Sequence, residues 1–475
     1  MGIQQFIDKN DIGILEAPED VLSTMTRDGK RRWMYPIASK GRYYWARMAV
    51  GWGLIAIFVL LPIIRMNGRP AILLDLLSRE FTFFGTTFYP TDTFLLLLWM
   101  VGFLLFIVLF TALLGRVWCG WACPQTVYME YLYRPIERLI EGNERARSKR
   151  DDGKKSFDYF WRKGIKYLLF LIVSLFLAHT FVAYFVSWDR LIAWMQQPPT
   201  EQWGYFVFMA ITTGMVLFDF AYFREQMCTI VCPYARIQSV LLDEDSLIVS
   251  YDPYRGEPRG RGKKREGLGD CIDCFACVRT CPTGIDIRDG LQMECIACTQ
   301  CIDACDDIMD RVGQPRGLIR YTSENALEGQ RSRITRPRVL LYSGVFALAA
   351  GLFLMVLTNR GDYDVNVGRA TGAPYMEMPE GEIANRLRFR VRNQTGEARS
   401  FEIRAVQPAG ADVRLVGTSP IALDPGDMTR VEAWIVVPPE QLATGQTEGE
   451  FELVFDDGSI HRTSFTLIGP RQTFP

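Results

Sequence analysis

FLLLLWMVGFLLFIVLFTALL, residues 94–114, is a run of 21 residues without one charged side chain. A helix needs about 20 apolar residues to cross the hydrocarbon core of a bilayer. A water-soluble helix keeps one polar face, whereas this run is apolar on every side. The apolar runs of this length occupy residues 46–64, 93–114, 165–186, 204–223 and 339–357. The sequence therefore predicts a polytopic α-helical membrane protein with five transmembrane helices.

Lysine and arginine are distributed unevenly between the segments that connect these runs. RARSKR at 145–150 is typical of the basic segments, and segments with few basic residues alternate with them. Basic loops stay on the cytoplasmic side of a bacterial inner membrane. The predicted cytoplasmic segments are the N-terminal tail 1–45, the basic loop 115–164 and the segment 224–337. The predicted periplasmic segments are the loops 65–92 and 187–203 and the C-terminal segment 360–475.

The C-terminal segment 360–475 has no long apolar run, and apolar and polar residues alternate along it instead. LRFRVRN (387–393), RVEAWIVV (430–437) and GEFELVF (449–455) alternate apolar and polar residues and are separated by Gly, Pro and Asn. Period-two alternation between frequent turns is typical of antiparallel strands with one buried face. The segment is therefore predicted to form a small β-sandwich.

Composition restricts the class of protein further. The formal net charge is −1, so no basic surplus indicates a nucleic-acid partner. All 12 cysteines lie between residues 119 and 305, at short regular spacings. A disulfide-stabilised secreted protein spreads its cysteines differently, so the clustering favours metal ligation.

Eight of the cysteines form an internal repeat. CIDCFACVRTC (271–281) and CIACTQCIDAC (295–305) superpose with every cysteine in register. The C-x2-C-x2-C-x3-C spacing lets three thiolates bind one [4Fe–4S] cluster while the fourth reaches the other cluster. A pair of zinc sites is the alternative, but zinc ribbons separate their cysteine pairs more widely. The predicted ligand sets are Cys271, Cys274, Cys277 and Cys305 for one cluster, and Cys281, Cys295, Cys298 and Cys301 for the second.

Four cysteines remain, in two copies of CxxxCP at the cytoplasmic ends of parallel predicted spans. They are Cys119, Cys123, Cys228 and Cys232. If a helix continues through each pair, both thiols share one face. Two such pairs can form a four-thiolate site for copper, zinc or an iron–sulfur cluster, and thiolate favours Cu(I) over Cu(II). Inert buried thiols are the alternative.

Several stretches resemble the CcoG family, also called FixG or RdxA, which comprises accessory proteins in the biogenesis of cbb3-type cytochrome c oxidase. The resemblance is carried by KRRWMYPIASKGRYYWAR (30–47), FGTTFYPTD (84–92), GRVWCGWACPQTVYMEYLYRPIERLIEG (115–142), EQMCTIVCPYARIQSVLLDEDSLIVSYDPYRGEPRG (225–260), the double cysteine block and CIDACDDIMDRVGQPRGLIRYTSEN (301–325). It implies five spans, two cytoplasmic [4Fe–4S] clusters in a bacterial dicluster ferredoxin-like domain, and a periplasmic immunoglobulin-like domain. It further implies reduction of Cu(II) to Cu(I), with copper as substrate, for the oxidase copper centre. The oxidase subunits, its other assembly factors and a copper transporter are the implied partners.

Two classes of function fit these features. One is a membrane oxidoreductase that reduces copper, and the other is a non-catalytic relay or assembly subunit that passes electrons to another membrane protein. CxxxCP with YDPYRGEPRG also resembles the membrane ferredoxins of nitrate and nitrous-oxide reduction, which feed other enzymes. The chain carries no nucleotide, flavin or c-type haem motif, so an unknown donor must supply its electrons.

Two intramembrane polar residues have open roles. His179 lies in a predicted span, where packing or one hydrogen bond is as reasonable as function. Asp219 is predicted to pair with Arg224, and bordering the thiol site is the alternative.

Overall fold

The computed structural model describes residues 23–25, 31–66, 68–76, 78–262, 266–379 and 381–470. The chain divides into two compact units. The first, called here the membrane unit, extends to Phe84 and resumes over Leu96–Phe353. The second, the C-terminal unit, comprises Gly85–Leu95 and the chain from Leu354.

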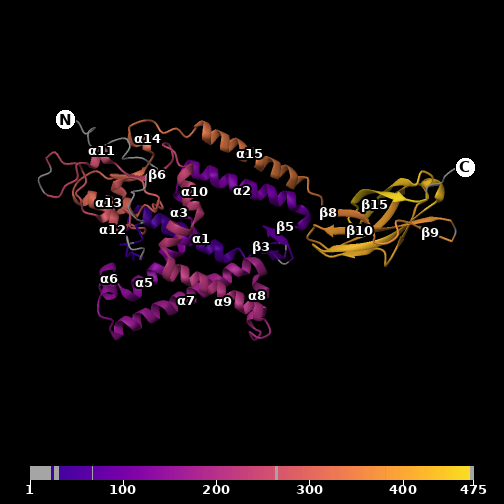
Figure 1. The fold of residues 1–475 in the computed structure, drawn as a ribbon, viewed down its shortest axis with the longest axis horizontal. Helices are drawn as coiled ribbons and strands as arrows, with labels where there is room; N and C mark the ends of the chain where they lie inside the picture. Colours follow the sequence, from indigo (N-terminus) through magenta and orange to yellow (C-terminus); the bar gives the residue numbers. More distant parts are fainter. Residues whose placement is uncertain are drawn as a thin grey trace. The chain divides into compact units, whose positions relative to one another are not determined.

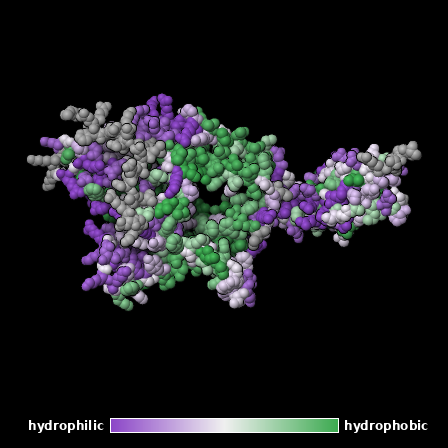
Figure 2. Space-filling view, in the orientation of Figure 1, coloured by the Kyte–Doolittle hydropathy of each residue, from purple (hydrophilic) through white to green (hydrophobic). Residues whose placement is uncertain are grey.

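Five helices in the described chain are long and apolar enough to cross a membrane. They are α1 (Arg42–Leu60), α2 (Thr93–Leu114), α7 (Phe157–Val186), α9 (Trp203–Phe218, with a π-helical extension to Phe223) and α15 (Pro337–Thr358). Many of their large apolar side chains are exposed, for example Leu104 and Leu348. Figure 2 shows such residues gathered over the middle of the membrane unit. Exposed apolar surface of this extent is stable in lipid and not in water.

The first of these helices lies four residues earlier than its apolar run predicts. It begins at Arg42 and ends at Leu60 instead of covering 46–64. Pro62 explains the early end, because proline has no N–H to continue the backbone ladder. The third helix begins at Phe157, before its predicted start at 165, so its first turns carry charged residues.

Short elements occupy the end of the membrane unit that holds the cysteines (Figure 1). The helices are α3 (Val117–Trp121), α4 (Pro124–Tyr128), α5 (Arg134–Glu141), α6 (Glu144–Asp152), α10 (Pro233–Leu241), α11 (Pro253–Gly256), α12 (Ala276–Thr280), α13 (Gln300–Arg311) and α14 (Glu324–Leu327). Strands β6 (Ile248–Tyr251) and β7 (Ile319–Thr322) pair antiparallel, with Val249 opposite Tyr321. Val249, Ile302 and Met309 belong to one buried core. Four of the eight block cysteines belong to the same core, and two more pack against it. This core fixes the two cysteine blocks relative to each other.

At the opposite ends of the apolar helices the membrane unit has little regular structure. Strands β1 (Arg65–Met66) and β2 (Arg69–Pro70) form one hairpin, and β3 (Ile72–Asp75) and β4 (Glu80–Phe83) form another. Helix α8 (Trp188–Met195) follows α7, and α7 packs along α9. The region 65–92, expected from sequence to be a loop, therefore contains short strands.

The C-terminal unit is a sandwich of two antiparallel sheets, as its alternation predicts. One sheet has the order β12 (Asp412–Leu415), β14 (Met428–Val437), β10 (Ile383–Asn393), β8 (Tyr363–Arg369), with β9 (Met376–Glu377) beside β10. The other has the order β13 (Ile421–Leu423), β11 (Arg399–Gln407), β15 (Gln446–Phe455), β16 (Ile460–Ile468). Alternate residues face the core, where Phe389 meets Phe451 edge-on with ring centroids 5.5 Å apart. Strand β5 (Thr86–Phe88) also belongs to this unit, and Arg360 bonds to the Thr87 carbonyl at 2.9 Å.

Candidate metal centres

The eight block cysteines line two separate hollows. Each hollow receives three cysteines of one block and the last cysteine of the other, which is the crossed arrangement that the spacing predicts. Cys277 also reaches the wall of the first hollow, so the two hollows are neighbours. The first is lined by Cys281, Cys295, Cys298 and Cys301, and the second by Cys271, Cys274, Cys277 and Cys305.

The backbone of the two blocks is strained at equivalent positions. Asp273 and Phe275 in the first block, and Ala297 and Thr299 in the second, have positive φ between 51° and 61°. Non-glycine residues adopt this region at a cost, and such residues concentrate at binding sites. The left-handed turns wrap the loops around their hollows and aim backbone N–H groups inward. The Ala297 N–H, for example, donates a hydrogen bond to the Cys295 sulfur.

The walls of the hollows are apolar, with Ile285 and Ile287 on one and Ile308 and Leu318 on the other. Burial raises the pKa of Cys277 and of Cys305 to about 12. Thiols in such surroundings stay protonated unless a cationic centre binds them. Four soft thiols around an enclosed, apolar hollow, with inward N–H donors, fit a [4Fe–4S] cluster.

The membrane-edge pairs have matching local geometry. The Cys123 N–H bonds to the Trp118 carbonyl at 2.9 Å, and the Cys232 N–H to the Met227 carbonyl at 2.8 Å, five residues back in each case. The helix does not continue through either pair, so the condition for a shared helical face is not met. Cys123 and Cys232 are extended, with ψ of 126° and 112°. The following prolines disfavour a helical conformation at the residue before them, and each proline starts a new helix.

The four thiols nevertheless share one electrostatic environment. Burial raises the pKa of Cys119 to about 12, and the neighbouring Cys123 contributes. The pKa of Cys228 is raised well above its usual value by burial and then by Cys123, Cys119 and Cys232. Within the described chain, no three His, Cys, Asp or Glu side chains are arranged to hold one metal ion. A single ion at these thiols therefore requires them to close in, whereas a cluster takes ligands that stand farther apart.

Gly120, inside the first pair, lies directly against the second cysteine block. A Cβ atom placed on Gly120 would lie 2.5 Å from the Ala297 carbonyl oxygen and 2.7 Å from that of Ile296. Arg47 of α1, only 1% exposed, fastens the same contact. Its Nε donates to the Gly120 carbonyl at 2.9 Å and its Nη1 to the Cys298 carbonyl at 2.7 Å. One buried guanidinium thus connects the segment of the first membrane-edge pair to Cys298, a cysteine of the first hollow.

Arg116 makes a second bridge between the same two segments. It lies three residues before Cys119 and is 3% exposed. Its Nη1 donates to the carbonyls of Gln292, Met293 and Cys295 at 3.0, 2.6 and 3.0 Å. Buried arginines that satisfy several carbonyls hold loops rigidly. The hollow lined by Cys295 and Cys298 is therefore the one that adjoins the membrane-edge thiols.

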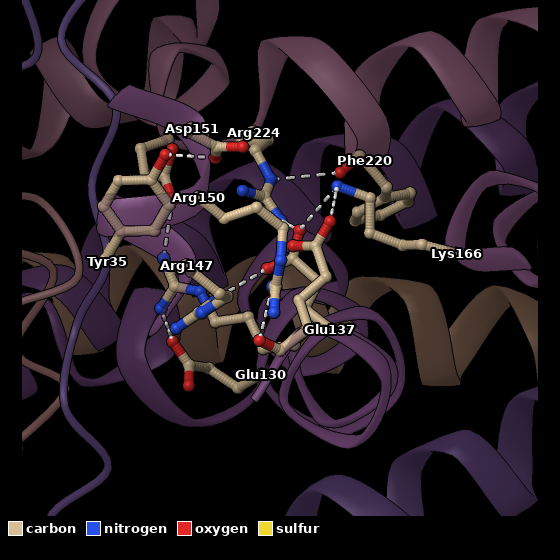
Figure 3. Close-up of polar contacts among 12 residues, drawn as sticks. Tyr35, Glu130, Glu137, Arg147, Arg150, Asp151, Lys166, Phe220 and Arg224 are labelled. Atoms are coloured by element: carbon tan, nitrogen blue, oxygen red, sulfur yellow. Dashed lines mark hydrogen bonds and ion pairs between the residues drawn. The ribbon is translucent and has the colours of Figure 1, made fainter. Parts of the chain in front are cut away.

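A buried ion-pair network supports the other side of the thiol site (Figure 3). Glu137 of α5 contacts Arg224 at 2.5 Å, Arg147 at 3.1 Å and Lys166 at 3.9 Å. Although burial alone would raise the pKa of Glu137, Arg224 and the other cations lower it to about 2. Arg224 lies four residues before Cys228, so this network anchors the segment that carries the second pair.

A second group of charges continues from this network toward the N-terminal segment. Glu225 pairs with Arg134 at 2.6 Å and with Arg31 at 3.3 Å, and Arg134 also pairs with Glu130. All of these side chains are 8% exposed or less. Arg31 thereby connects its part of the chain to Glu225, three residues before Cys228.

Comparison with known proteins places the chain in a family. The "Nitrogen fixation protein FixG" of Rhizobium meliloti (strain 1021) is 33% identical over 93% of this chain and 94% of its own length. The chain belongs to the FixG/RdxA family. "Protein RdxA" and "Protein RdxB" of Cereibacter sphaeroides are 35% and 37% identical, each over 82% of this chain and 85% of its own length.

Three family models match parts of this FixG/RdxA chain. "IG-like fold at C-terminal of FixG" matches residues 353–470, and "4Fe-4S dicluster domain" matches 223–324. "4Fe-4S binding domain" matches 95–143, where the cysteines are Cys119 and Cys123. Together with the apolar helices, these matches identify a membrane iron–sulfur redox protein with an immunoglobulin-like C-terminal domain.

Two expectations about intramembrane residues have definite outcomes in this FixG/RdxA chain. The preferred pairing of Asp219 with Arg224 is wrong, because the Arg224 side chain binds Glu137 instead. Gln125 Nε2 donates to Asp219 Oδ1 at 3.1 Å, and Asp219 adds to the raised pKa of Cys123, so Asp219 borders the thiol site. His179 Nδ1 bonds to the Leu175 carbonyl at 2.8 Å.

Sequence reasoning missed Arg47, Arg116 and Gly120. The available signal was two arginines at the margins of apolar runs, where an unpaired charge is costly. A buried guanidinium needs hydrogen-bond acceptors, but the carbonyls that accept from Arg47 and Arg116 lie in distant segments that the sequence does not reveal.

Proposed function

We propose that this chain is a membrane iron–sulfur oxidoreductase of oxidase biogenesis that reduces Cu(II) to Cu(I) at its four membrane-edge thiols. The proposed recipient of the Cu(I) is the copper centre of a cbb3-type cytochrome c oxidase, reached through the oxidase subunits, other assembly factors or a copper transporter. The N-terminus, the cysteine blocks and the membrane-edge thiols are proposed to face the cytoplasm, and the C-terminal unit the periplasm. The lysine and arginine distribution supports this orientation.

The proposal rests mainly on the packing of the first thiol pair against the second cysteine block. The segment with Cys119 and Cys123 is packed against the block with Cys295 and Cys298, through Gly120 and Arg47. Thiols with no redox role have no need of such contact. A thiol pair packed against a cysteine-lined hollow forms part of an acceptor site beside a donor site.

The proposed resident cofactors are two [4Fe–4S] clusters held by the eight block cysteines. When bound, such clusters supply single electrons, which matches the reaction Cu(II) + e⁻ → Cu(I). The four membrane-edge thiols hold copper as substrate, and sulfur ligands stabilise the Cu(I) product. Arg47 and Arg116 keep the two segments in contact, and Glu137 holds Arg224 and the second pair in place.

The experiment compares the parent with the double variant Cys119→Ala/Cys228→Ala, and with Val231→Ala as a matched control. Val231 adjoins Cys232 and is 52% exposed. Its truncation changes the same segment but leaves all four thiols in place. Reduction with dithionite under nitrogen bleaches the visible absorbance of the clusters. After the excess dithionite is removed, that absorbance should return when Cu(II) is added, with the Cu(I) captured by a chromogenic chelator. We expect the double variant to lose tight Cu(I) binding and most of the rate while it keeps both clusters. Equal rates in parent and double variant would refute the proposal.

A second candidate function is electron relay through a further cluster at the same four thiols. The match of residues 95–143 to a "4Fe-4S binding domain" favours it, because Cys119 and Cys123 are the cysteines in that range. Iron and acid-labile sulfide counts decide between the two. Eight iron atoms per chain, unchanged in the double variant, support copper reduction, and about twelve that fall to eight support the relay.

A further inference from the structure

Two buried arginines beside the first hollow carry charges that no carboxylate balances directly. They are Arg47 and Arg116. Within the part of the chain that the structure describes, both guanidinium groups donate to main-chain carbonyls, among them those of Cys298 and Cys295, and neither forms an ion pair. An isolated charge is costly to bury, so two such charges at one hollow indicate a negatively charged group nearby.

The charges of both arginines reach the cysteines of the first hollow. Burial raises the pKa of Cys298 to about 11, and the charge of Arg47 exerts the largest opposing effect. Burial also raises the pKa of Cys295, and the positive charge of Arg116 opposes this increase. The two guanidinium groups therefore favour negative charge on the sulfur atoms of this hollow.

The carboxylates around the first hollow do not remove this positive surplus. Glu130 is ion-paired with Arg134. Burial lowers the pKa of Arg116, and Cys295 opposes that effect more strongly than the carboxylate of Glu294 does. Even with Glu294 counted against Arg116, one buried guanidinium charge has no carboxylate to balance it.

The second hollow has a different balance of charge. Arg288 lines it and is buried, but it pairs with Asp273 at 2.8 Å and with Asp286 at 2.5 Å. Asp306, which follows Cys305, is also buried, and its ion pair with an exposed arginine is long, at 3.8 Å. The buried cation of the second hollow is therefore neutralised, and buried carboxylate charge remains beside Cys305.

We propose that Arg47 and Arg116 act as counter-charges to an iron–sulfur cluster in the first hollow and raise its reduction potential above that of a cluster in the second hollow. Four thiolates give such a cluster a net negative charge, and reduction adds one more negative charge. Buried cations stabilise the more negative, reduced form more strongly, because the Coulomb energy grows with charge and is little screened there.

This order of potentials gives electron movement in the chain a direction. One electron that enters either hollow comes to reside in the first, which adjoins the membrane-edge thiols, and no bond is made or broken as it moves. Arg47 and Arg116 are thus positioning residues for charge as well as for contact. The inference deepens the proposed function and rests on its clusters, but it does not depend on the reduction of copper.

The structure offers substitutions that separate the charge of these arginines from their contacts. Arg47→Gln and Arg116→Gln remove one charge each, whereas Arg47→Lys and Arg116→Lys keep the charge with a different donor geometry. Arg320→Gln is the control, because Arg320 is partly exposed and pairs with Asp252 at 2.9 Å. Loss of contact alone would affect the lysine and glutamine variants alike, so a difference between them reports the charge.

The assay is a redox titration of the full chain in detergent under nitrogen, without copper, followed by electron paramagnetic resonance. The parent should show two resolved midpoint potentials, with an uncoupled signal after the first electron and magnetic coupling after the second. Cys274→Ala, in the second hollow, should keep the upper midpoint, and Cys301→Ala, in the first, should keep the lower one. Each arginine-to-glutamine variant should reduce the electron affinity of the first hollow about tenfold, which lowers the upper midpoint by about 59 mV. The lysine variants and Arg320→Gln should keep both midpoints close to those of the parent.

Four results would overturn the proposal. These are coupling from the first electron onward in the parent, an upper midpoint that Cys274→Ala removes, parent-like midpoints in both glutamine variants at full iron content, and equal shifts in the lysine and glutamine variants. The first result needs no substitution, so it decides the question even where a variant fails to fold. Because copper and the membrane-edge thiols take no part in the titration, failure here leaves the proposed copper reduction standing, and failure of the copper assay leaves this inference standing.

Discussion

Glu137 is the centre of the buried ion-pair network, and its replacement should destabilise the membrane unit far more than loss of a surface ion pair. The Glu137 side chain is 6% exposed and contacts Arg224, Arg147 and Lys166 (Figure 3). Glu137→Gln preserves shape and removes the charge. Three cations would then share a buried space without their common counter-charge, which is the costly way to disrupt a buried pair.

The magnitude follows from the pKa of Glu137, which the surrounding cations lower from 4.5 to about 2 against the effect of burial. At 1.36 kcal/mol for each pH unit, the ionised carboxylate stabilises the folded state by on the order of 3 kcal/mol. Because the folded pKa is depressed, this contribution is complete above pH 4.5 and is lost as the pH falls toward 2. The loss at pH 7 on replacement should therefore be about 3–5 kcal/mol.

The assay is denaturant unfolding of the full chain in detergent at pH 7 and pH 4, with Asp307→Asn as control. Asp307 pairs with Arg311 at 2.6 Å on the surface, where both side chains are more than half exposed. Its loss should cost under about 1 kcal/mol. The difference between parent and Glu137→Gln should shrink at pH 4. A Glu137→Gln variant as stable as Asp307→Asn at pH 7 would refute the assignment of Glu137 as the organising charge.

Three further predictions concern the cysteines and the orientation. Gly120→Ala should separate the first thiol pair from the second block and slow Cu(II) reduction at least about tenfold, while cluster absorbance stays normal; an unchanged rate would contradict the packing argument. Cys281→Ser should abolish the magnetic coupling between two clusters in electron paramagnetic resonance of reduced protein, and intact coupling at full iron content would exclude crossed ligation. A reporter active only in the periplasm should be active when fused after residue 400 and silent near residue 150, and the reverse would invert the proposed orientation.

The fold was predictable from sequence to the extent that local patterns determine it. Five apolar runs predict the five long helices, and period-two alternation predicts the C-terminal sandwich. The errors lie at boundaries, where single residues decide. Pro62 ends α1 before its apolar run ends, and the charged first turns of α7 extend a helix that hydropathy alone starts later.

The grouping of the eight block cysteines could also be predicted from the sequence, because the repeat spacing implies the crossed arrangement. The membrane-edge pairs were not, because a spacing of four residues implies a shared helical face only if the helix is continuous. Pro124 and Pro233 favour the extended backbone that Cys123 and Cys232 adopt. These prolines thereby affect how each pair presents its thiols.

Arg47 shows why the connection between the two sets of cysteines could not be read from the sequence. It lies in a predicted span, yet its guanidinium reaches carbonyls 73 and 251 residues away. Local periodicity gives no information about partners at such separations. The cost of burying a guanidinium nevertheless requires partners, and main-chain carbonyls satisfy it without a second charge. Those carbonyls belong to Gly120 and Cys298, so Arg47 holds the first thiol pair against the second cysteine block. A neutral substitute such as Arg47→Met should therefore separate the thiol pair from the block, even where helix α1 is preserved.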